Sequence, residues 1–258
     1  MPRFAANLTM MFGEWSFLDR FAEAAEAGFT AVEFLFPYEH QPAEIADRLE
    51  RNGLEQALFN LPPGDWAAGE RGLAALPERA AEFRDSVARA LDYALATKAR
   101  RLHVMAGLAP SGSAEAGAAY REALRHACAA AAPHGIDILI EPLNKRDMPG
   151  YFLDDFGMAA DIIAELGLPN LKLQFDIYHR QILHGDVTRG LEALLPITGH
   201  IQIASVPLRQ EPGTGELDDA RLFATLDELD YAGFVGCEYR PRAGTLEGLA
   251  WFVRAPRR

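Results

Sequence analysis

The feature that most constrains the fold is a regular alternation of strand-like and helix-like segments along all 258 residues. Eight short apolar runs have the length and composition of buried strands, and a helix-like segment follows each of them. The predicted strands are Phe4–Leu8, Ala31–Phe36, Glu55–Asn60, Arg101–Ala106, Asp137–Leu143, Leu171–Ile177, His200–Ser205 and Phe234–Tyr239. Because a helix-length segment separates each strand from the next, we expect the strands to pair in parallel through crossover helices.

The segments between the strands carry helix start and stop signals. The predicted helices are Ser16–Gly28, Pro42–Gly53, Pro77–Ala99, Ser113–His134, Asp154–Gly167, Asp186–Gly199, Asp218–Gly233 and Thr245–Arg254. Most begin at Ser, Asp or Pro and end at or before Gly, as helix ends prefer. Eight strand–helix units in a chain of this length are typical of a single (β/α)8 TIM barrel domain spanning residues 1–258. A doubly wound open sheet uses the same local units, but the chain lacks a Gly-x-Gly-x-x-Gly turn and a P-loop, which favours the barrel.

Composition and charge exclude several classes of protein. Hydrophobic residues make up 49% and charged residues 24%, which is the composition of a globular protein. A net charge of −12 argues against nucleic acid or an anionic membrane as a partner, but a local arginine could still bind a small anionic substrate. No signal peptide or membrane span is expected, and two cysteines are too few for a disulfide framework. We therefore expect a cytoplasmic protein. The sequence is compatible with a monomer and with a homo-oligomer.

Polar side chains occur at the ends of four consecutive predicted strands. Strands of a parallel barrel are buried on both faces and should be nearly all apolar. Glu141, Asp176, Gln202 and Glu238 break this rule on the fifth to eighth strands. Because active sites in this fold lie at the carboxyl ends of the strands, these four side chains are expected to line one arc of the barrel mouth.

Three carboxylates and an amide oxygen form a hard ligand set that suits Mg²⁺ or Mn²⁺. Without a cation, converging carboxylates would raise one another's pKa values. The alternative is that each carboxylate is separately paired, for example with Arg101, Lys172 or Arg240. Four polar strand ends in succession are poorly explained by separate pairing, so the sequence favours a functional site.

Three further residues near these strand ends are candidates for binding substrate. His179 follows Asp176 by three residues and could donate a hydrogen bond to a substrate oxygen, or it is a solvated loop histidine. His103 alternates with apolar neighbours and points into the barrel, either into the site or into the core. Arg209 follows the seventh strand and could receive a carboxylate through two hydrogen bonds, or it is solvated.

The residues at these strand ends resemble the hydroxypyruvate isomerase family. The similar segments, which span nearly the whole chain, are Val32–Tyr38, His103–Gly107, Ile140–Asn144, Pro149–Leu153, Phe175–His179, Gly199–Ala204, Arg209–Glu216 and Cys237–Tyr239. Each motif alone is weak, whereas the combination is specific. This family belongs to the xylose-isomerase-like barrels, which also include ketose epimerases and DNA-repair enzymes of the endonuclease IV type.

The resemblance implies that Glu141 and Glu238 are catalytic and exchange a proton with a substrate carbon. It implies a divalent cation at Glu141, Asp176, Gln202 and Glu238, and a substrate contact at Asn144. The implied reaction converts hydroxypyruvate to tartronate semialdehyde, or 2-oxo-tetronate to 3-oxo-tetronate, and the motifs do not separate the two acids. Arg209 has Leu208 and Gln210 as neighbours, where the family more often has Gly and His, so carboxylate recognition is expected to differ in detail.

Three other functions stay in view. A ketose 3-epimerase would use the same fold on neutral sugars or sugar phosphates. A phosphodiesterase of the endonuclease IV type would need clustered zinc ions, and seven histidines with a net charge of −12 argue against it. A non-catalytic sugar-acid-binding protein would keep its ligand after the substitution Glu141→Gln.

Overall fold

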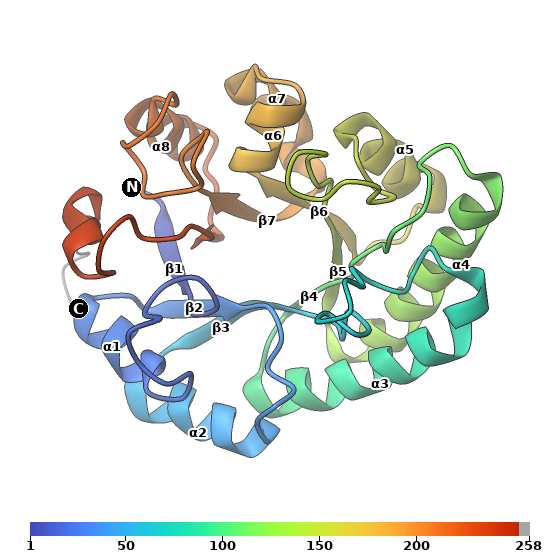
Figure 1. The fold of residues 1–258 in the computed structure, drawn as a ribbon, viewed down its shortest axis with the longest axis horizontal. Helices are drawn as coiled ribbons and strands as arrows, with labels where there is room; N and C mark the ends of the chain where they lie inside the picture. Colours follow the sequence, from blue (N-terminus) through green and yellow to red (C-terminus); the bar gives the residue numbers. More distant parts are fainter. Residues whose placement is uncertain (253–258) are drawn as a thin grey trace.

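The computed structural model describes residues 1–252, which contain a closed barrel of eight parallel strands. Each strand pairs with the next one in the chain, and β8 returns to pair with β1. The strands are β1 (Arg3–Asn7), β2 (Ala31–Phe34), β3 (Glu55–Asn60), β4 (Arg101–His103), β5 (Asp137–Ile140), β6 (Leu171–Asp176), β7 (Thr198–Ile203) and β8 (Phe234–Cys237). Figure 1 shows the strands at the centre of the molecule and the helices around them. The predicted barrel is confirmed, and the open-sheet alternative is wrong.

The helices cover the outer face of the barrel. They are α1 (Arg20–Ala27), α2 (Pro42–Asn52), α3 (Ala80–Thr97), α4 (Ala114–Ala131), α5 (Phe156–Leu166), α6 (Ile177–Leu183), α7 (Val187–Leu194) and α8 (Asp219–Glu228), with short 3-10 helices at η1 (Pro77–Arg79), η2 (Ala132–His134), η3 (Leu195–Ile197) and η4 (Glu247–Trp251). The ends follow local chemistry. In α5, for example, the Asp155 carboxylate accepts a hydrogen bond from the Met158 N–H at 2.8 Å, and Gly167 ends the helix with a φ of 58°.

Two helical segments differ from the prediction. The chain enters α6 directly from β6, because the Asp176 carboxylate accepts a hydrogen bond from the Tyr178 N–H at 2.7 Å and caps a new helix there. The segment predicted as helix Thr245–Arg254 is instead the 3-10 helix η4, and its last two positions lie outside the described residues. Glu14 accepts hydrogen bonds from the Thr245 N–H and hydroxyl, which connects the start of this segment to the loop after β1.

The interior of the barrel is polar along most of its length. A small apolar cluster that is separate from the main core contains Ala5, Ala31, Ala57 and Phe234. Residues two apart on a strand point to the same face, so Asn7 and Glu33 lie on the same face as Ala5 and Ala31. The buried polar residues include Asn7, Glu33, His103, Gln174, His200 and Gln202. Burying polar groups in the lumen costs free energy unless each group is hydrogen-bonded.

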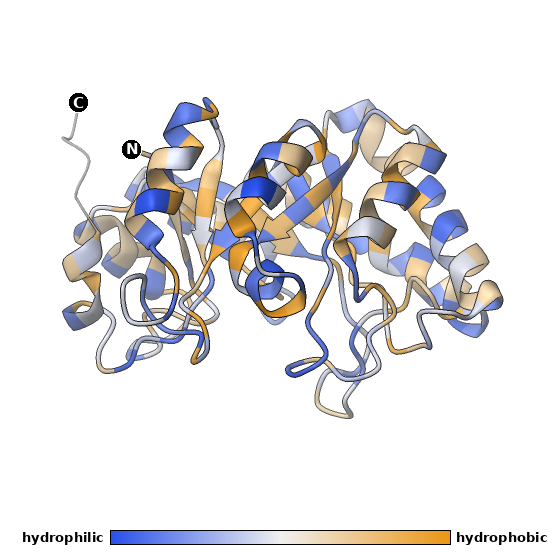
Figure 2. Cartoon of the chain, turned by 90° about the horizontal axis from the view of Figure 1, so that it is seen from above, coloured by the Kyte–Doolittle hydropathy of each residue, from blue (hydrophilic) through white to orange (hydrophobic). Residues whose placement is uncertain are grey.

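Long loops gather at the carboxyl ends of the strands. The segments after β3, β5 and β7 run over 61–76, 141–155 and 204–218, whereas those before β2, β3 and β4 run over 28–30, 53–54 and 98–100. Figure 2 shows the long loops together at one end of the barrel, the lower end in that view. Within residues 1–252, no helix combines the length and the apolar character that crossing a bilayer requires.

Candidate active site

The four strand-end residues all lie at the mouth of the barrel. Glu141 directly follows β5, Asp176 ends β6, Gln202 is on β7 and Glu238 directly follows β8. Their side chains are buried, and none of these residues is more than 8% exposed. Two further side chains bridge these residues in pairs. The amide of Gln174 connects Glu141 with Gln202, and the guanidinium of Arg209 connects Asp176 with Glu238.

The amide bridge is made by Gln174, a residue of β6 that points into the lumen. Its Nε2 donates to Glu141 Oε2 at 3.0 Å and to Gln202 Oε1 at 2.6 Å. Glu141 Oε1 is buried and has no hydrogen-bond partner among the described residues. One oxygen of Glu141 is thus held by the protein, and the other is free to meet a ligand.

The guanidinium bridge is made by Arg209, which the loop after β7 carries back into the mouth. Its Nη2 donates to Glu238 Oε2 and lies 3.4 Å from Asp176 Oδ2. Arg209 has a φ of 54°, which non-glycine residues rarely adopt, and its backbone is held by Ser205 and Arg240 at 2.8 and 2.9 Å. The Arg209 Nε is buried without a hydrogen-bond partner within the described chain. The interpretation of Arg209 as a solvated loop residue is therefore wrong.

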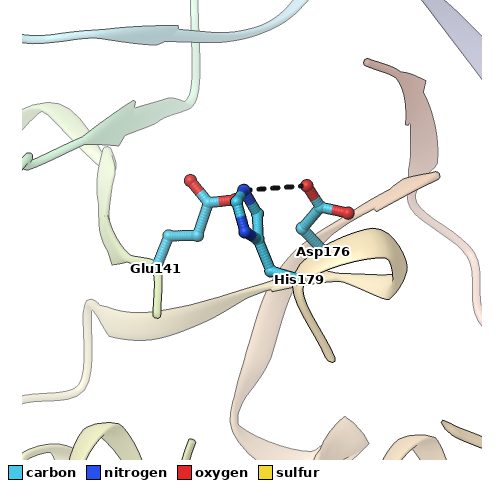
Figure 3. Close-up of side chains that lie close together, drawn as sticks. All are labelled: Glu141, Asp176 and His179. Atoms are coloured by element: carbon cyan, nitrogen blue, oxygen red, sulfur yellow. Dashed lines mark ion pairs between the residues drawn. The ribbon is translucent and has the colours of Figure 1, made fainter. Parts of the chain in front are cut away.

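His179 is a neutral ring with a defined tautomer. Its Nδ1 lies 3.0 Å from the Asn144 backbone N–H and 2.8 Å from the Asn144 side-chain amide nitrogen. Since the backbone N–H can only donate, Nδ1 is the acceptor and Nε2 carries the hydrogen. Burial holds the pKa of His179 well below its usual range, and the Arg209 charge adds to this shift. In Figure 3 the ring lies between Glu141 and Asp176, with Nε2 at 3.6 Å from Asp176 Oδ2.

Asn144 is fully buried behind this ring. Its Oδ1 accepts hydrogen bonds from the N–H groups of Arg146 and Asp147, each at 3.0 Å, which turns its amide nitrogen toward His179. Asn144 therefore orients His179 in this structure. Its predicted contact with substrate stays a prediction.

His103 points into the lumen beside Glu141. Its Nδ1 lies 3.7 Å from Glu141 Oε2, and neither ring nitrogen has a hydrogen-bond partner within residues 1–252. Burial lowers the pKa of His103 to about 3, so the ring is neutral at pH 7. A buried histidine with two unsatisfied nitrogens is not a satisfied core residue, which favours a ligand-binding interpretation.

The carboxyl groups at the mouth have raised pKa values. Burial raises the pKa of Glu238 to about 8 and that of Asp176 to about 6, although the Arg209 guanidinium acts in the opposite direction on both. Burial, together with the neighbouring Glu238 and Asp176, holds the pKa of Glu141 well above its usual range. Carboxyl groups whose pKa values are raised toward neutrality can exchange protons near neutral pH, as general acids and bases do.

The donor atoms at the mouth also fit a hard divalent cation. One donor atom each from Glu141, Asp176 and His179 lie within 4.8 Å of one another. Because His179 Nε2 carries a hydrogen, the carboxylate oxygens and Gln202 Oε1 are the better ligands, and oxygen ligands suit Mg²⁺ or Mn²⁺. A cation at these oxygens would compete with Arg209 for Asp176 and Glu238.

The sequence analysis did not identify two lumen residues that hydrogen-bond to the site residues and hold them in place. Gln174 and Glu33 both lie in the lumen, and both bond directly to predicted site residues. The alternation of Lys172, Gln174 and Asp176 on one buried strand is the signal that could have identified Gln174. A polar residue at every second position of a buried strand points to a polar lumen.

Buried carboxylates, neutral histidines and an arginine at the carboxyl ends of barrel strands define an enzyme site suited to proton transfer. Residues 21–255 match the family model described as xylose isomerase-like TIM barrel. The chain therefore belongs to this family, and within it to the group of hydroxypyruvate and 2-oxo-tetronate isomerases.

Individual relatives are similar over almost their whole length. The chain is 58% identical over 253 residues to the 2-oxo-tetronate isomerase of Cupriavidus necator, with 97% of each chain covered. It is 46% identical over 253 residues to the hydroxypyruvate isomerase of Escherichia coli, with 97% of this chain and 98% of the relative covered. A crystal structure of a Brucella melitensis protein called AP endonuclease, family 2, shares 52% identity with a TM-score of 0.96, covering 98% of both chains. The 3-keto-D-glucoside 4-epimerase of Escherichia coli has a TM-score of 0.80 at 23% identity over 97% of this chain and 98% of that chain, which shows a shared fold.

Proposed function

We propose that this protein is an intramolecular oxidoreductase that isomerises a short hydroxy-oxo acid. The substrate is hydroxypyruvate, giving tartronate semialdehyde, or 2-oxo-tetronate, giving 3-oxo-tetronate. The observation that carries the proposal is the pair of buried carboxyl groups of Glu141 and Glu238, on strands separated by β6 and β7. The names of the similar relatives support the choice of acids.

The reaction requires two proton movements. A carbonyl moves from C2 to C3 when the proton on C3 is removed, an enediolate forms, and a proton is returned to C2. A second proton passes from the C3 oxygen to the C2 oxygen, so that no other reactant is consumed. A substrate placed over Asp176 and Gln202 would have Glu141 on one side and Glu238 on the other, one acting as base and the other as acid.

Each further residue has a distinct task in this reaction. The Nε2–H of His179 donates to a substrate oxygen and stabilises the negative charge that develops there. The unsatisfied nitrogens of His103 offer a second hydrogen-bond partner beside Glu141. Arg209 holds Glu238 through Nη2 and keeps Nε for the substrate carboxylate.

A divalent cation, Mg²⁺ or Mn²⁺, would be held by oxygen atoms of Glu141, Asp176, Gln202 and Glu238. When bound, it would supply Lewis-acid stabilisation of negatively charged substrate oxygens. The donor set supports this part of the proposal, because all four donors are oxygen atoms of buried residues, which suits a hard cation.

We infer a small anionic sugar acid as the partner of the site, with no role for nucleic acid or a membrane. The net charge of −12 and the Arg209 guanidinium at the mouth support this inference. A cytoplasmic location fits the two buried cysteines, which are unpaired.

Proton NMR in D2O tests the proposal. The protein is incubated with hydroxypyruvate and, separately, with 2-oxo-tetronate, with Mg²⁺ or Mn²⁺ and again with a chelator. We expect deuterium to enter at the carbon beside the carbonyl while the isomer appears, and the faster acid identifies the substrate. Loss of both signals with chelator would assign the cation to the mechanism. No exchange with either acid would overturn the proposal and favour a ketose 3-epimerase, for which neutral ketoses are the next substrates.

A further inference from the structure

Glu33 on β2 is a fully buried acidic side chain that reaches across the lumen. It is 1% exposed, and its partners are Asn7, His200 and Gln202. Two of these partners lie on β7, a strand that does not neighbour β2 in the barrel. The side chain thus links β2 to β7, two strands that are separated by β1 and β8, below the mouth.

The space for this carboxylate is provided by a glycine. A Cβ atom at Gly236 on β8 would lie 2.1 Å from Glu33 Oε2, closer than any real contact allows. Gly236 therefore leaves room that the Glu33 carboxylate fills. The space at Gly236 and the three polar partners together offset the cost of burying the Glu33 carboxylate in the lumen.

The partners of Glu33 fix the orientation of the Gln202 amide. Glu33 Oε1 receives the amide N–H groups of Asn7 at 2.9 Å and Gln202 at 2.8 Å. A carboxylate oxygen only accepts hydrogen bonds, so Gln202 presents Nε2 to it. The Oε1 atom of Gln202 is consequently turned the other way, toward Gln174.

The same constraint passes through Gln174 to Glu141. Because Gln202 presents its oxygen, Gln174 must present Nε2, and this nitrogen also donates to Glu141 Oε2. A reversed Gln202 would either set its NH2 group against that of Gln174 or, if Gln174 also reversed, turn the Gln174 carbonyl oxygen toward the Glu141 carboxylate. We call Glu33, Gln202, Gln174 and Glu141 the lumen chain.

We propose that Glu33 is a positioning residue that sets the direction of the hydrogen bonds in the lumen chain and thereby leaves Glu141 Oε1 as the oxygen that faces substrate. This inference rests on the proton transfer proposed above for Glu141. Glu33 itself touches no reacting atom. It acts through two amides, and its effect depends on which atom is oxygen and which is nitrogen.

The substitution Glu33→Gln tests this dependence with almost no change of shape. An amide at position 33 has one acceptor oxygen where the carboxylate has two, so it cannot serve both the Asn7 and Gln202 amides and His200 in the same way, and Gln202 and Gln174 lose their fixed direction. We expect kcat to fall by about tenfold, the size of one misdirected hydrogen bond, with KM nearly unchanged. The matched control is Asp137→Asn, the same carboxylate-to-amide change at the start of β5, which should leave kcat as it is.

A reciprocal exchange separates direction from packing. In the double variant Glu33→Gln, Gln202→Glu, the new carboxylate accepts from Gln174 whichever way residue 33 is turned, so Gln174 regains its direction toward Glu141. We expect each single variant to lose activity and the double variant to regain most of the loss suffered by Glu33→Gln. Additive losses would show a packing role for Glu33 and overturn the inference.

Neutron diffraction provides a readout that does not depend on activity. In the perdeuterated wild-type protein, both amide deuterons of Gln174 should face Glu141 and Gln202, whereas Glu33→Gln should show a reversed or mixed Gln174 amide. If Glu33→Gln does not fold, Gly236→Ala serves instead, because its Cβ displaces the Glu33 carboxylate. An unchanged Gln174 amide would overturn the inference. A wild-type protein inactive on both acids would overturn only the proposed function.

Discussion

The guanidinium of Arg209 donates to the carboxylate of Glu238 within the barrel mouth. The residue expected to receive a substrate carboxylate is therefore already bound to a carboxylate expected to move a proton. Arg209 keeps its buried Nε free of protein partners, at least among residues 1–252. One side chain can thus hold a catalytic group and still offer a donor to the substrate.

The substitution Arg209→Ala should impair both binding and turnover. We expect KM for hydroxypyruvate to rise by about tenfold or more, because a charge-assisted hydrogen bond to the carboxylate is lost, and kcat to fall because Glu238 loses its partner. The neutral ketose dihydroxyacetone, tested as a competitive inhibitor, should bind nearly as before. Arg240→Ala is the control, since Arg240 is exposed and its backbone contact with Arg209 survives. Equal weakening of acid and neutral ketose would remove Arg209 from carboxylate recognition.

The substitutions Glu141→Gln and Glu238→Gln should each abolish turnover while the fold persists. Removing a general acid or base costs about 10²- to 10⁴-fold, and each amide keeps the shape of the side chain it replaces. Deuterium exchange at the substrate carbon measures the chemical step, and circular dichroism checks the fold. Glu165→Gln, on the outer helix α5, should retain full activity. Near-normal turnover in either lumen variant would contradict the mechanism.

Two substitutions at His179 distinguish its nitrogen atoms. Glutamine can place an N–H near the position of Nε2, whereas asparagine can place an acceptor near Nδ1 but has nothing at Nε2. Because Nδ1 only accepts from Asn144 in this structure, we expect His179→Gln to keep more activity than His179→Asn. Steady-state kcat for both variants provides the comparison. The reverse order would mean that Nε2 has no part in the reaction.

Removal of Arg209 should tighten the binding of a divalent cation. Its positive charge lies beside Asp176 and Glu238, which are two of the expected ligands, and charges of like sign at this distance repel each other. Electron paramagnetic resonance of free Mn²⁺ measures the dissociation constant without any turnover. We expect a lower constant for Arg209→Ala than for the wild type, and a higher one for Asp176→Asn. Identical constants in all three proteins would place the cation elsewhere.

The protein should lose stability in alkaline solution. Burial raises the pKa of Cys128 to about 12 and that of Tyr120 well above its usual range, whereas in the unfolded chain they ionise near about 8.5 and 10. Between about pH 8.5 and 12 the unfolded chain binds fewer protons than the folded one, so the free energy of unfolding falls as pH rises. Urea unfolding at several pH values measures the decline. A flat profile above pH 9 would contradict the burial of these groups.

The order of strands and helices could be predicted because each element carries its own local signals. Where prediction failed, the contact at the differing segment is local in one case and distant in sequence in the other. The helix α6 begins where Asp176 caps the chain as it leaves β6, and Thr245, just before η4, is bonded to Glu14, which lies 231 residues away in sequence. The contact of Glu14 with Thr245 cannot be recognised from the residues near either one alone.

The strand-end residues of the site could be predicted because ionisable groups on buried strands are conspicuous. Their partners could not be predicted. Glu33 meets His200 and Gln202 across the lumen, at sequence separations of 167 and 169 residues. Which lumen residues meet depends on the tilt and stagger of the strands, and these are properties of the closed barrel.

The distance in sequence between Glu33 and its partners also affects how the protein is made. Synthesis proceeds from the N-terminus, so Glu33 leaves the ribosome long before His200, Gln202 and Gly236 exist. Until β7 and β8 arrive, a buried Glu33 would lack most of its hydrogen-bond donors, and burial without them is unfavourable. The lumen can therefore become dry only when the last two strands close the barrel. A chain that stops short of β8 leaves this end of the barrel open to water, and no partly made copy of the protein carries a formed site.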